Sequence, residues 1–195
     1  MQELYRQGAT SSLLRNGREV SNLYRGGRRI RQPGMGLGDD ATWRSRVLLK
    51  IVQFLALMLT ALALIPAGAH LFALANKISL AADQYFIVQS IYRGWALLGI
   101  ALVGALLANL ALAILLRGRG APFVLALVAF LCIALSLVIF FTWTYPANQA
   151  TRSWTAIPAN WQQLRRQWEY SHAADAIVTF AAFCSLVLSV LATRK

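Results

Sequence analysis

His172 and the aromatic side chains that precede it are the residues of this chain best suited to chemistry. Two tryptophans, a leucine and a histidine recur at intervals of three or four residues, namely Trp161, Leu164, Trp168 and His172. On a helix this spacing places them on one face. Glu169 and Asp175 each lie one turn or less from His172, and an imidazole beside a carboxylate is a common general base. A capping or structural role for His172 is the alternative, and it stays open.

Further candidate residues lie in two segments between long apolar runs. The first segment contains His70, and the second contains Asn148 and Trp154 and ends at His172. Most of the tryptophans of the chain lie in or beside these segments. Aromatic residues near a membrane surface commonly anchor a protein there, so an interfacial belt or a packed cap is the alternative to a ligand pocket.

The spacing of the possible metal ligands argues against a metal centre. Glu169 and His172 have the i, i+3 spacing of half a di-iron site in a helical bundle, but the chain has no second Glu-x-x-His sequence. His70 and His172 would provide just two ligands for a metal or haem. Cys132 and Cys184 both lie inside apolar runs, and no Cys-x-x-Cys motif is present. We therefore predict no metal and no cofactor, and we exclude disulfide-exchange chemistry.

The second segment and the helix after it resemble the anthrone-oxygenase-like family of small four-span membrane proteins. The resemblance rests on Asn148 after Thr-Tyr-Pro-Ala, on Trp154-Thr155, and on the pattern Trp161-x-x-Leu-Arg-x-x-Trp168-Glu169-x-x-His172. It covers roughly residues 47–192. It implies a four-helix membrane bundle, and in the characterised branch of the family it implies oxidation of polyketide anthrones by O₂ without metal or flavin.

The resemblance also implies roles for individual residues. Asn148, Trp161, Trp168 and His172 are the site positions that it carries over. His172, helped by Glu169 or Asp175, would remove an acidic C–H proton, and the resulting carbanion would reduce O₂. Asn148 would donate a hydrogen bond to a ketone oxygen. Four residues make up the predicted substrate-binding set: Trp161, Trp168, His70 and Trp154.

Four apolar runs must position these residues, and each is long enough to cross a bilayer. They cover residues 47–69, 94–116, 121–145 and 173–192, and a span needs about 20 residues. We predict an all-α integral membrane protein with four transmembrane helices, an amphipathic helix in the loop before the fourth span, and a basic N-terminal arm. Pro66 and Gly68 should loosen the last turn of the first span.

The second run has its own packing signals. Ala101, Gly104, Ala105 and Ala108 give it a face of small residues that favours close helix packing. Asn109 is polar within this run, and we expect it to hydrogen-bond to a backbone carbonyl or a hydroxyl on a neighbouring helix. The middle of each run carries no charge, which argues against an ion or proton path.

The first 46 residues form a different region, with nine arginines, seven glycines and four acidic residues. We predict two parts, a basic arm at 1–46 and a membrane bundle at 47–195. Six arginines are the candidates for binding a partner or anionic lipid head groups: Arg25, Arg28, Arg29, Arg31, Arg44 and Arg46. The net charge of +12 flanks apolar spans, so it predicts contact with lipid and not with nucleic acid.

Arginines near the first span and between the second and third spans predict the orientation. Arg44, Arg117 and Arg119, with the terminal Lys195, place both termini in the cytoplasm by the positive-inside rule. The predicted location is the bacterial inner membrane. The leading functional hypothesis is a binding or accessory subunit that docks on another membrane protein through its arm. The alternative is a cofactor-independent oxygenase with His172 as its base, and a pigment or quinone site is compatible with either.

Overall fold

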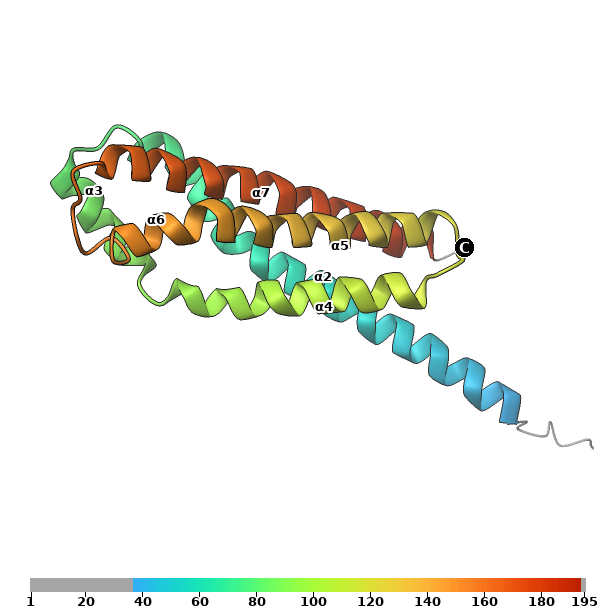
Figure 1. Ribbon diagram of the computed structural model, residues 1–195. Helices are drawn as coiled ribbons and strands as arrows, with labels where there is room; N and C mark the ends of the chain where they lie inside the picture. The colour runs from blue at the N-terminus through green and yellow to red at the C-terminus, as the bar shows by residue number, and fades with distance from the viewer. Residues whose placement is uncertain (1–36, 194–195) are drawn as a thin grey trace, which may run out of the picture. The chain divides into compact units, whose positions relative to one another are not determined.

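Four long helices make up the membrane-spanning part of the protein, as the sequence predicts. The computed structural model describes residues 37–193 of the chain, with side chains from residue 42 onward. The long helices are α2 (Leu37–Lys77), α4 (Gly99–Leu115), α5 (Ala121–Ile139) and α7 (Trp161–Ala192) (Figure 1). The apolar stretches long enough to cross a membrane are Thr42–Lys77, Trp95–Leu115, Ala121–Ala150 and Trp161–Ala192. The described residues form no strand, so the fold is an all-α, four-span membrane bundle.

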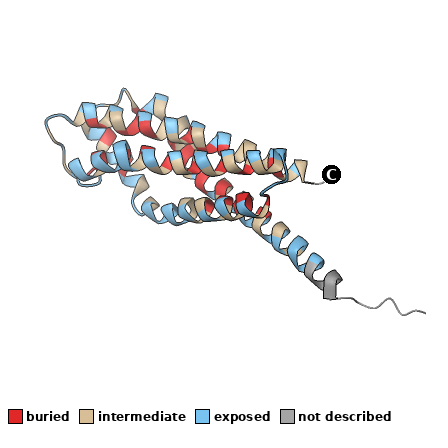
Figure 2. Ribbon diagram, turned by 45° about the vertical axis from the view of Figure 1, so that its right-hand side comes forward, coloured by how far each residue is buried: buried red, intermediate tan, exposed pale blue. Residues whose placement is uncertain are grey.

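The outer surface of the helices is apolar, which is the surface that a bilayer requires. Phe54, Ile100, Leu131 and Phe180, one from each long helix, are all exposed. Buried positions lie along the faces that the helices turn to one another (Figure 2). Many of them are alanines, such as Ala56, Ala105, Ala126 and Ala182. Small residues let helix backbones approach closely where lipid supplies no hydrophobic force between helices.

The predicted small-residue face of α4 packs against α2. A Cβ atom added to Gly104 would lie 3.3 Å from the Cδ1 and Cδ2 atoms of Leu59, so glycine permits this close contact. Asn109 donates hydrogen bonds from Nδ2 to Thr60 Oγ1 at 3.0 Å and to the Ala105 carbonyl at 2.8 Å. Thr60 is a partner of the predicted kind, a hydroxyl on a neighbouring helix, whereas Ala105 belongs to α4 itself. The prediction for Asn109 is confirmed.

Two helices are longer than their apolar runs. We expected α2 to loosen near Pro66 and Gly68 and to end at about residue 69, but it continues to Lys77, so this prediction is wrong. Proline is tolerated in a transmembrane helix because neighbouring groups satisfy the carbonyl that it frees. The predicted amphipathic helix forms, but as the first turns of α7 and without a break before the span.

Short elements gather at one end of the bundle. They are α3 (Ala82–Gln89), η1 (Ser90–Tyr92) and η2 (Trp95–Leu98), then η3 (Phe140–Thr144) and α6 (Tyr145–Ala150). Figure 1 shows α3 and α6 at the same end as the start of α7. Buried side chains of α3, α6, the loop after α6 and the first turns of α7 form one cluster, called the cap below. Its core members are Tyr85, Ala147, Trp154, Leu164 and Trp168. A packed cap is therefore present, in place of an interfacial belt at Trp154 and Trp168.

The predicted arm lies largely outside the described residues. Arg25, Arg28, Arg29 and Arg31 fall in that part, so their roles stay predictions. Arg44 and Arg46 are exposed in the first turns of α2. The boundary at residue 46 falls within α2, and the division into arm and bundle stays a prediction.

Candidate functional site

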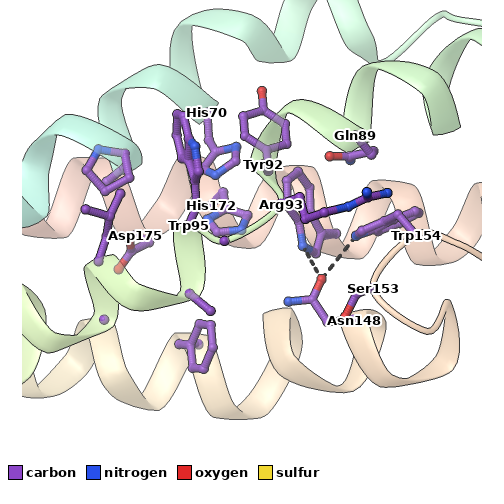
Figure 3. Close-up of a pocket in the computed structure, with 18 of the residues that line it drawn as sticks. His70, Gln89, Tyr92, Arg93, Trp95, Asn148, Ser153, Trp154, His172 and Asp175 are labelled. Carbon is purple, nitrogen blue, oxygen red and sulfur yellow. Dashed lines mark hydrogen bonds between the residues drawn. The ribbon is translucent and has the colours of Figure 1, made fainter.

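A large pocket lies between the cap and the membrane-spanning part of the bundle. Its volume is about 790 Å³, which is within the range of about 300–1,000 Å³ typical of small-molecule sites. It is lined by residues of α2, α4, α5 and α7, of the short elements α3, η1, η2, η3 and α6, and of the loop after α6. Figure 3 shows His70, His172 and Asn148 around its centre, with Asp175 to one side. Most of the lining is apolar or aromatic, with a few polar groups among it.

The two histidines of the chain stack on each other in this pocket. The ring centroids of His70 and His172 are 4.0 Å apart, and their planes differ by 26°. Trp168 meets both rings edge-on, at 4.8 Å from His70 and 4.3 Å from His172. Tyr92 and Trp95 also pack on His70, with ring centroids at 4.3 and 5.7 Å. These five rings, called the aromatic box below, make a flat-walled site of the kind that a planar ligand fills.

Both histidines line the pocket, and His172 is the more accessible of the two. Its side chain is partly accessible, and no hydrogen bond joins its ring nitrogens to any residue between 42 and 193. His70 is 5% exposed, and its Nδ1 atom is buried without a hydrogen-bond partner among those residues. Buried polar atoms normally have partners, so the pair leaves hydrogen-bonding capacity unused.

Asn148 is held by two tryptophans. Its Oδ1 atom accepts hydrogen bonds from Trp168 Nε1 at 2.8 Å and from Trp154 Nε1 at 3.1 Å, the dashed lines in Figure 3. An indole N–H only donates, so the oxygen of the amide must face the two indoles. The Nδ2 group then points the other way, and it donates to no residue in the described part of the chain. Asn148 lines the pocket, so it presents an amide N–H₂ donor there.

An unusual turn places Trp154 beside Asn148. Arg152, Ser153 and Trp154 all have left-handed backbones, with φ of 49°, 55° and 64°. This conformation costs about 1–2 kcal/mol for each L-residue, so other interactions must stabilise it. The buried Thr151 does so, because its Oγ1 accepts from Trp154 N at 3.1 Å and its carbonyl accepts from Thr155 N at 3.0 Å. The turn directs the Trp154 indole inward, where it is 7% exposed.

A buried ion pair supports the aromatic box from behind. Lys77 Nζ lies 3.0 Å from Glu169 Oε1, and the two side chains are 3% and 0% exposed. Tyr85 donates to the same carboxylate oxygen at 2.9 Å, and Gln89 donates to the Tyr85 hydroxyl. Burial, and the nearby Glu169 carboxylate, raise the pKa of the Tyr85 phenol well above its usual range. The phenol therefore stays a hydrogen-bond donor at neutral pH.

The ammonium group of this ion pair also contacts the box. Lys77 Nζ lies 4.7 Å from the centroid of the Tyr92 ring and 5.0 Å from that of Trp168. Cations attract aromatic faces at such distances, and more strongly where water is excluded. Lys77 thus links the end of α2 to η1 and α7. Arg165 has a similar role farther out. Its guanidinium lies 4.7 Å from the centroid of the Trp161 ring, and its Nη1 atom donates a hydrogen bond to the Leu80 carbonyl at 2.7 Å.

A second carboxyl group reaches the pocket from α7. Asp175 lines the pocket one turn after His172, and Ser136 of α5 donates a hydrogen bond to its Oδ1 atom. No cationic side chain pairs with Asp175 among the residues from 42 to 193. Ionisable residues inside membrane segments are rare and commonly functional.

Most of the predicted site residues come together in the structure. His70, Asn148, Trp154, Trp168 and His172 all line the pocket. Two of the predicted residues do not. Trp161 packs on Tyr85 and Phe86 in the cap, with centroids 6.4 and 6.3 Å away. Glu169 lies behind the pocket, in the ion pair with Lys77, so Asp175 is the carboxylate that shares the pocket with His172.

Several contributing residues were missed by sequence reasoning. The expected end of the first span near residue 69 placed Lys77 in the loop after it. Its spacing of seven residues from His70 places both on one face of a continuous helix, a usable signal once α2 is known to continue. Tyr92 and Trp95 lie in short helical turns that have no periodic pattern.

The described residues contain no group of three or more His, Cys, Asp or Glu side chains arranged to hold a metal ion. The two imidazoles meet face to face, which is a packing contact and not a pair of ligands converging on one point. The prediction that no metal or cofactor is used stays a prediction.

Removing one member of the Lys77–Glu169 ion pair should destabilise the protein more than removing both members. We expect Lys77→Met or Glu169→Leu alone to lower the free energy of unfolding by about 3–5 kcal/mol, because each leaves a buried charge without its partner. The double variant should lose less than the sum of the two. Unfolding by SDS titration in mixed micelles measures these values. Arg166→Met is the matched control, because Arg166 is an exposed cation on α7, the helix that carries Glu169. Additive losses in the double variant would contradict the coupling.

Comparisons of the chain with models of protein families, with curated proteins and with solved structures found no match. The resemblance to the anthrone-oxygenase-like family therefore stays a prediction from the quoted residues. The function has to follow from the geometry of the pocket.

Proposed function

We propose that this membrane protein binds a flat, lipid-soluble aromatic molecule that carries a carbonyl oxygen, such as a quinone or an aryl ketone. The observation that supports this most directly is the fixed amide of Asn148. Two donor-only indoles hold its oxygen, so its N–H₂ group points away from them and has no hydrogen-bond partner among residues 42–193. A carbonyl oxygen is the complementary ligand group.

The walls of the pocket suit a planar ring. Trp168, Trp95 and His172 present ring faces and edges to the space beside Asn148. Aromatic rings in stacked or edge-on contact gain about 0.5–1.5 kcal/mol beyond the area that they bury. Because the protein spans the membrane, a ligand of this kind can concentrate in the surrounding lipid before it binds.

The remaining polar groups allow the ligand to carry a hydroxyl group as well. His172 and Asp175 both line the pocket. A carboxylate accepts hydrogen bonds, and an imidazole accepts through its unprotonated nitrogen. Together with the Asn148 donor, these acceptors match a ring with a carbonyl on one edge and a hydroxyl on another.

A cofactor-independent oxygenase is the second candidate function. What favours it is the position of His172, which lines the same pocket as Asn148 and makes no hydrogen bond through its ring nitrogens to any described residue. His172 would remove a C–H proton from an anthrone, and Asn148 would stabilise the resulting enolate oxygen. The carbanion would give two electrons to O₂ and form a hydroperoxide at the same carbon. Loss of the second C–H proton from that carbon, with cleavage of the O–O bond, would then release water and leave the anthraquinone.

A role as an accessory subunit stays a prediction, because most of the arm that would dock on a partner lies outside the described residues. Arg44 and Arg46 are exposed and available to anionic lipid or a partner. The bacterial inner membrane and a cytoplasmic location of both termini also stay predictions. The binding function proposed here is compatible with membership of a larger complex.

The hydrogen-bonding role of Asn148 toward the ligand can be reversed while its contacts with the two indoles are kept. Asn148→Asp keeps an oxygen that accepts from the two indoles but turns a second oxygen, an acceptor, toward the ligand. We expect binding of 2,3-dimethyl-1,4-naphthoquinone to weaken by about tenfold or more, as the loss of one hydrogen bond and a new repulsion would cause. Quenching of tryptophan fluorescence in lipid nanodiscs measures the affinity. Asn76→Asp is the control, because Asn76 is exposed on α2 and does not line the pocket. Equal affinity of the Asn148→Asp variant and the wild type would remove the main support for the proposal.

The oxygenase candidate has its own test. A catalysed reaction should consume one O₂ for each hydroxyanthrone oxidised, measured with an oxygen electrode against the uncatalysed rate. We expect His172→Ala to lower the catalysed rate by about 10²- to 10⁴-fold, the usual effect of losing a general base. The Asn76→Asp variant should keep the full rate. An unchanged rate in His172→Ala would show that His172 is not the base.

A further inference from the structure

We propose that the ligand carries a long apolar tail, and that this tail leaves the pocket sideways into the bilayer through a slot between the start of α4 and η3. The occupant would be a prenyl- or alkyl-tailed aromatic carbonyl compound, with its ring in the aromatic box. This inference rests on the binding function proposed above and specifies its ligand class and entry route.

The pocket is longer than a ring requires, and its character changes along its length. On α2 its lining runs from Ala63 to His70, which is roughly 10 Å at 1.5 Å per helical residue. The Asn148 amide and the histidine pair lie toward the cap. At the other end the lining is mostly apolar, with Ala63, Leu102, Val103 and Leu137, and Asp175 is the polar exception. A ring bound beside Asn148 would leave this apolar end unfilled.

The apolar end opens toward lipid. Val103 on α4 and Phe141 in η3 both line the pocket, and they are 49% and 60% exposed. Leu98 and Gly99, at the start of α4, also line the pocket and are also exposed. All four residues belong to membrane-spanning segments, so the medium outside this rim is hydrocarbon. A polar ligand group would find no hydrogen-bond partner in hydrocarbon, whereas an alkyl chain would stay in an apolar solvent.

The local backbone explains why the two sides of the rim stand apart. On one side, Gly94 has a φ of 87° and begins the short η2 turn before α4. On the other side, η3 is a π-helical turn that leads into Pro146, which lacks a backbone N–H. Wide turns of this type occur frequently at functional sites.

Gly99 marks free space at the rim. A Cβ atom added there would meet no heavy atom within 4 Å, in contrast with Gly104 on the same helix, which lies against Leu59. Gly99 also has an ordinary helical backbone, so a larger residue is compatible with its conformation. A bulky side chain at position 99 should therefore block the slot and leave the aromatic box intact.

The experiment compares one ring with and without a tail. The probes are 2,3-dimethyl-1,4-naphthoquinone and the same naphthoquinone carrying a geranylgeranyl group in place of one methyl, both in phosphatidylcholine nanodiscs. Affinities are expressed as mole fractions in the lipid, so that partitioning into the bilayer is removed. The proteins are the wild type, Gly99→Trp, and the control Gly68→Trp on α2, where an added Cβ meets only Phe72 at 4.0 Å.

We expect Gly99→Trp to weaken binding of the tailed probe by tenfold or more and to change binding of the untailed probe by less than twofold. Gly68→Trp should change neither. Equal weakening of both probes by Gly99→Trp, or of neither, would overturn the lateral slot. If the wild type binds the untailed probe and not the tailed one, the lateral slot is also overturned. The proposed binding function would still stand in that case.

Two further outcomes separate the alternatives. If the wild type binds neither probe, the proposed function itself is wrong, and the slot has no ligand to admit. Brominated phosphatidylcholine tests the remaining occupant, a lipid acyl chain, because bromine quenches nearby tryptophans such as Trp95. Quenching that the tailed probe cannot displace would assign the slot to lipid and overturn the proposal.

Discussion

The buried ion pair between Lys77 and Glu169 is the interaction on which the rest of the site depends. Removing two such charges from water costs several kcal/mol for each ion, so their contact must be supported by other groups. Tyr85 donates to the same carboxylate oxygen, and the faces of Tyr92 and Trp168 surround the ammonium group. These contacts fix the last turn of α2 against the third turn of α7. The same two helices carry His70 and His172, so the ion pair determines that the two imidazoles stack.

The pocket follows from this constraint and from one more, the directionality of the indole N–H group. Trp168 meets the histidine pair on one side and donates to Asn148 on the other. The strained turn at 152–154 brings a second indole to the same oxygen. Asn148 therefore has one possible orientation, and its free donor faces the pocket. A rigid aromatic site with one fixed donor is preorganised for a planar carbonyl ligand, which reduces the entropy cost of binding.

The sequence predicted the architecture well because its signals are local. Long apolar runs indicate spans, and the helical spacing of Trp161, Trp168 and His172 indicates one continuous face. Of the four positions that the family resemblance named, Asn148, Trp168 and His172 lie together in the pocket, and Trp161 does not line it. The ion pair could not be predicted, because it joins residues 92 positions apart in a fold whose helix ends were uncertain. A lysine at the end of a span usually reaches water, and Pro66 suggested an earlier end to α2. The pairing of Ser136 with Asp175 likewise depends on how α5 and α7 are rotated, which periodicity alone does not specify.

The most direct test of a bound aromatic carbonyl compound is to identify what the protein carries when it is isolated. The protein would be extracted from its native membranes in mild detergent, and its absorption spectrum and native mass spectrum recorded before and after extraction with organic solvent. We expect one lipid-soluble aromatic carbonyl compound per chain, with an apolar tail, and its absence from the Asn148→Asp variant prepared in the same way. Isolation with phospholipid alone, or with the same compound equally retained by the variant, would contradict the proposed site.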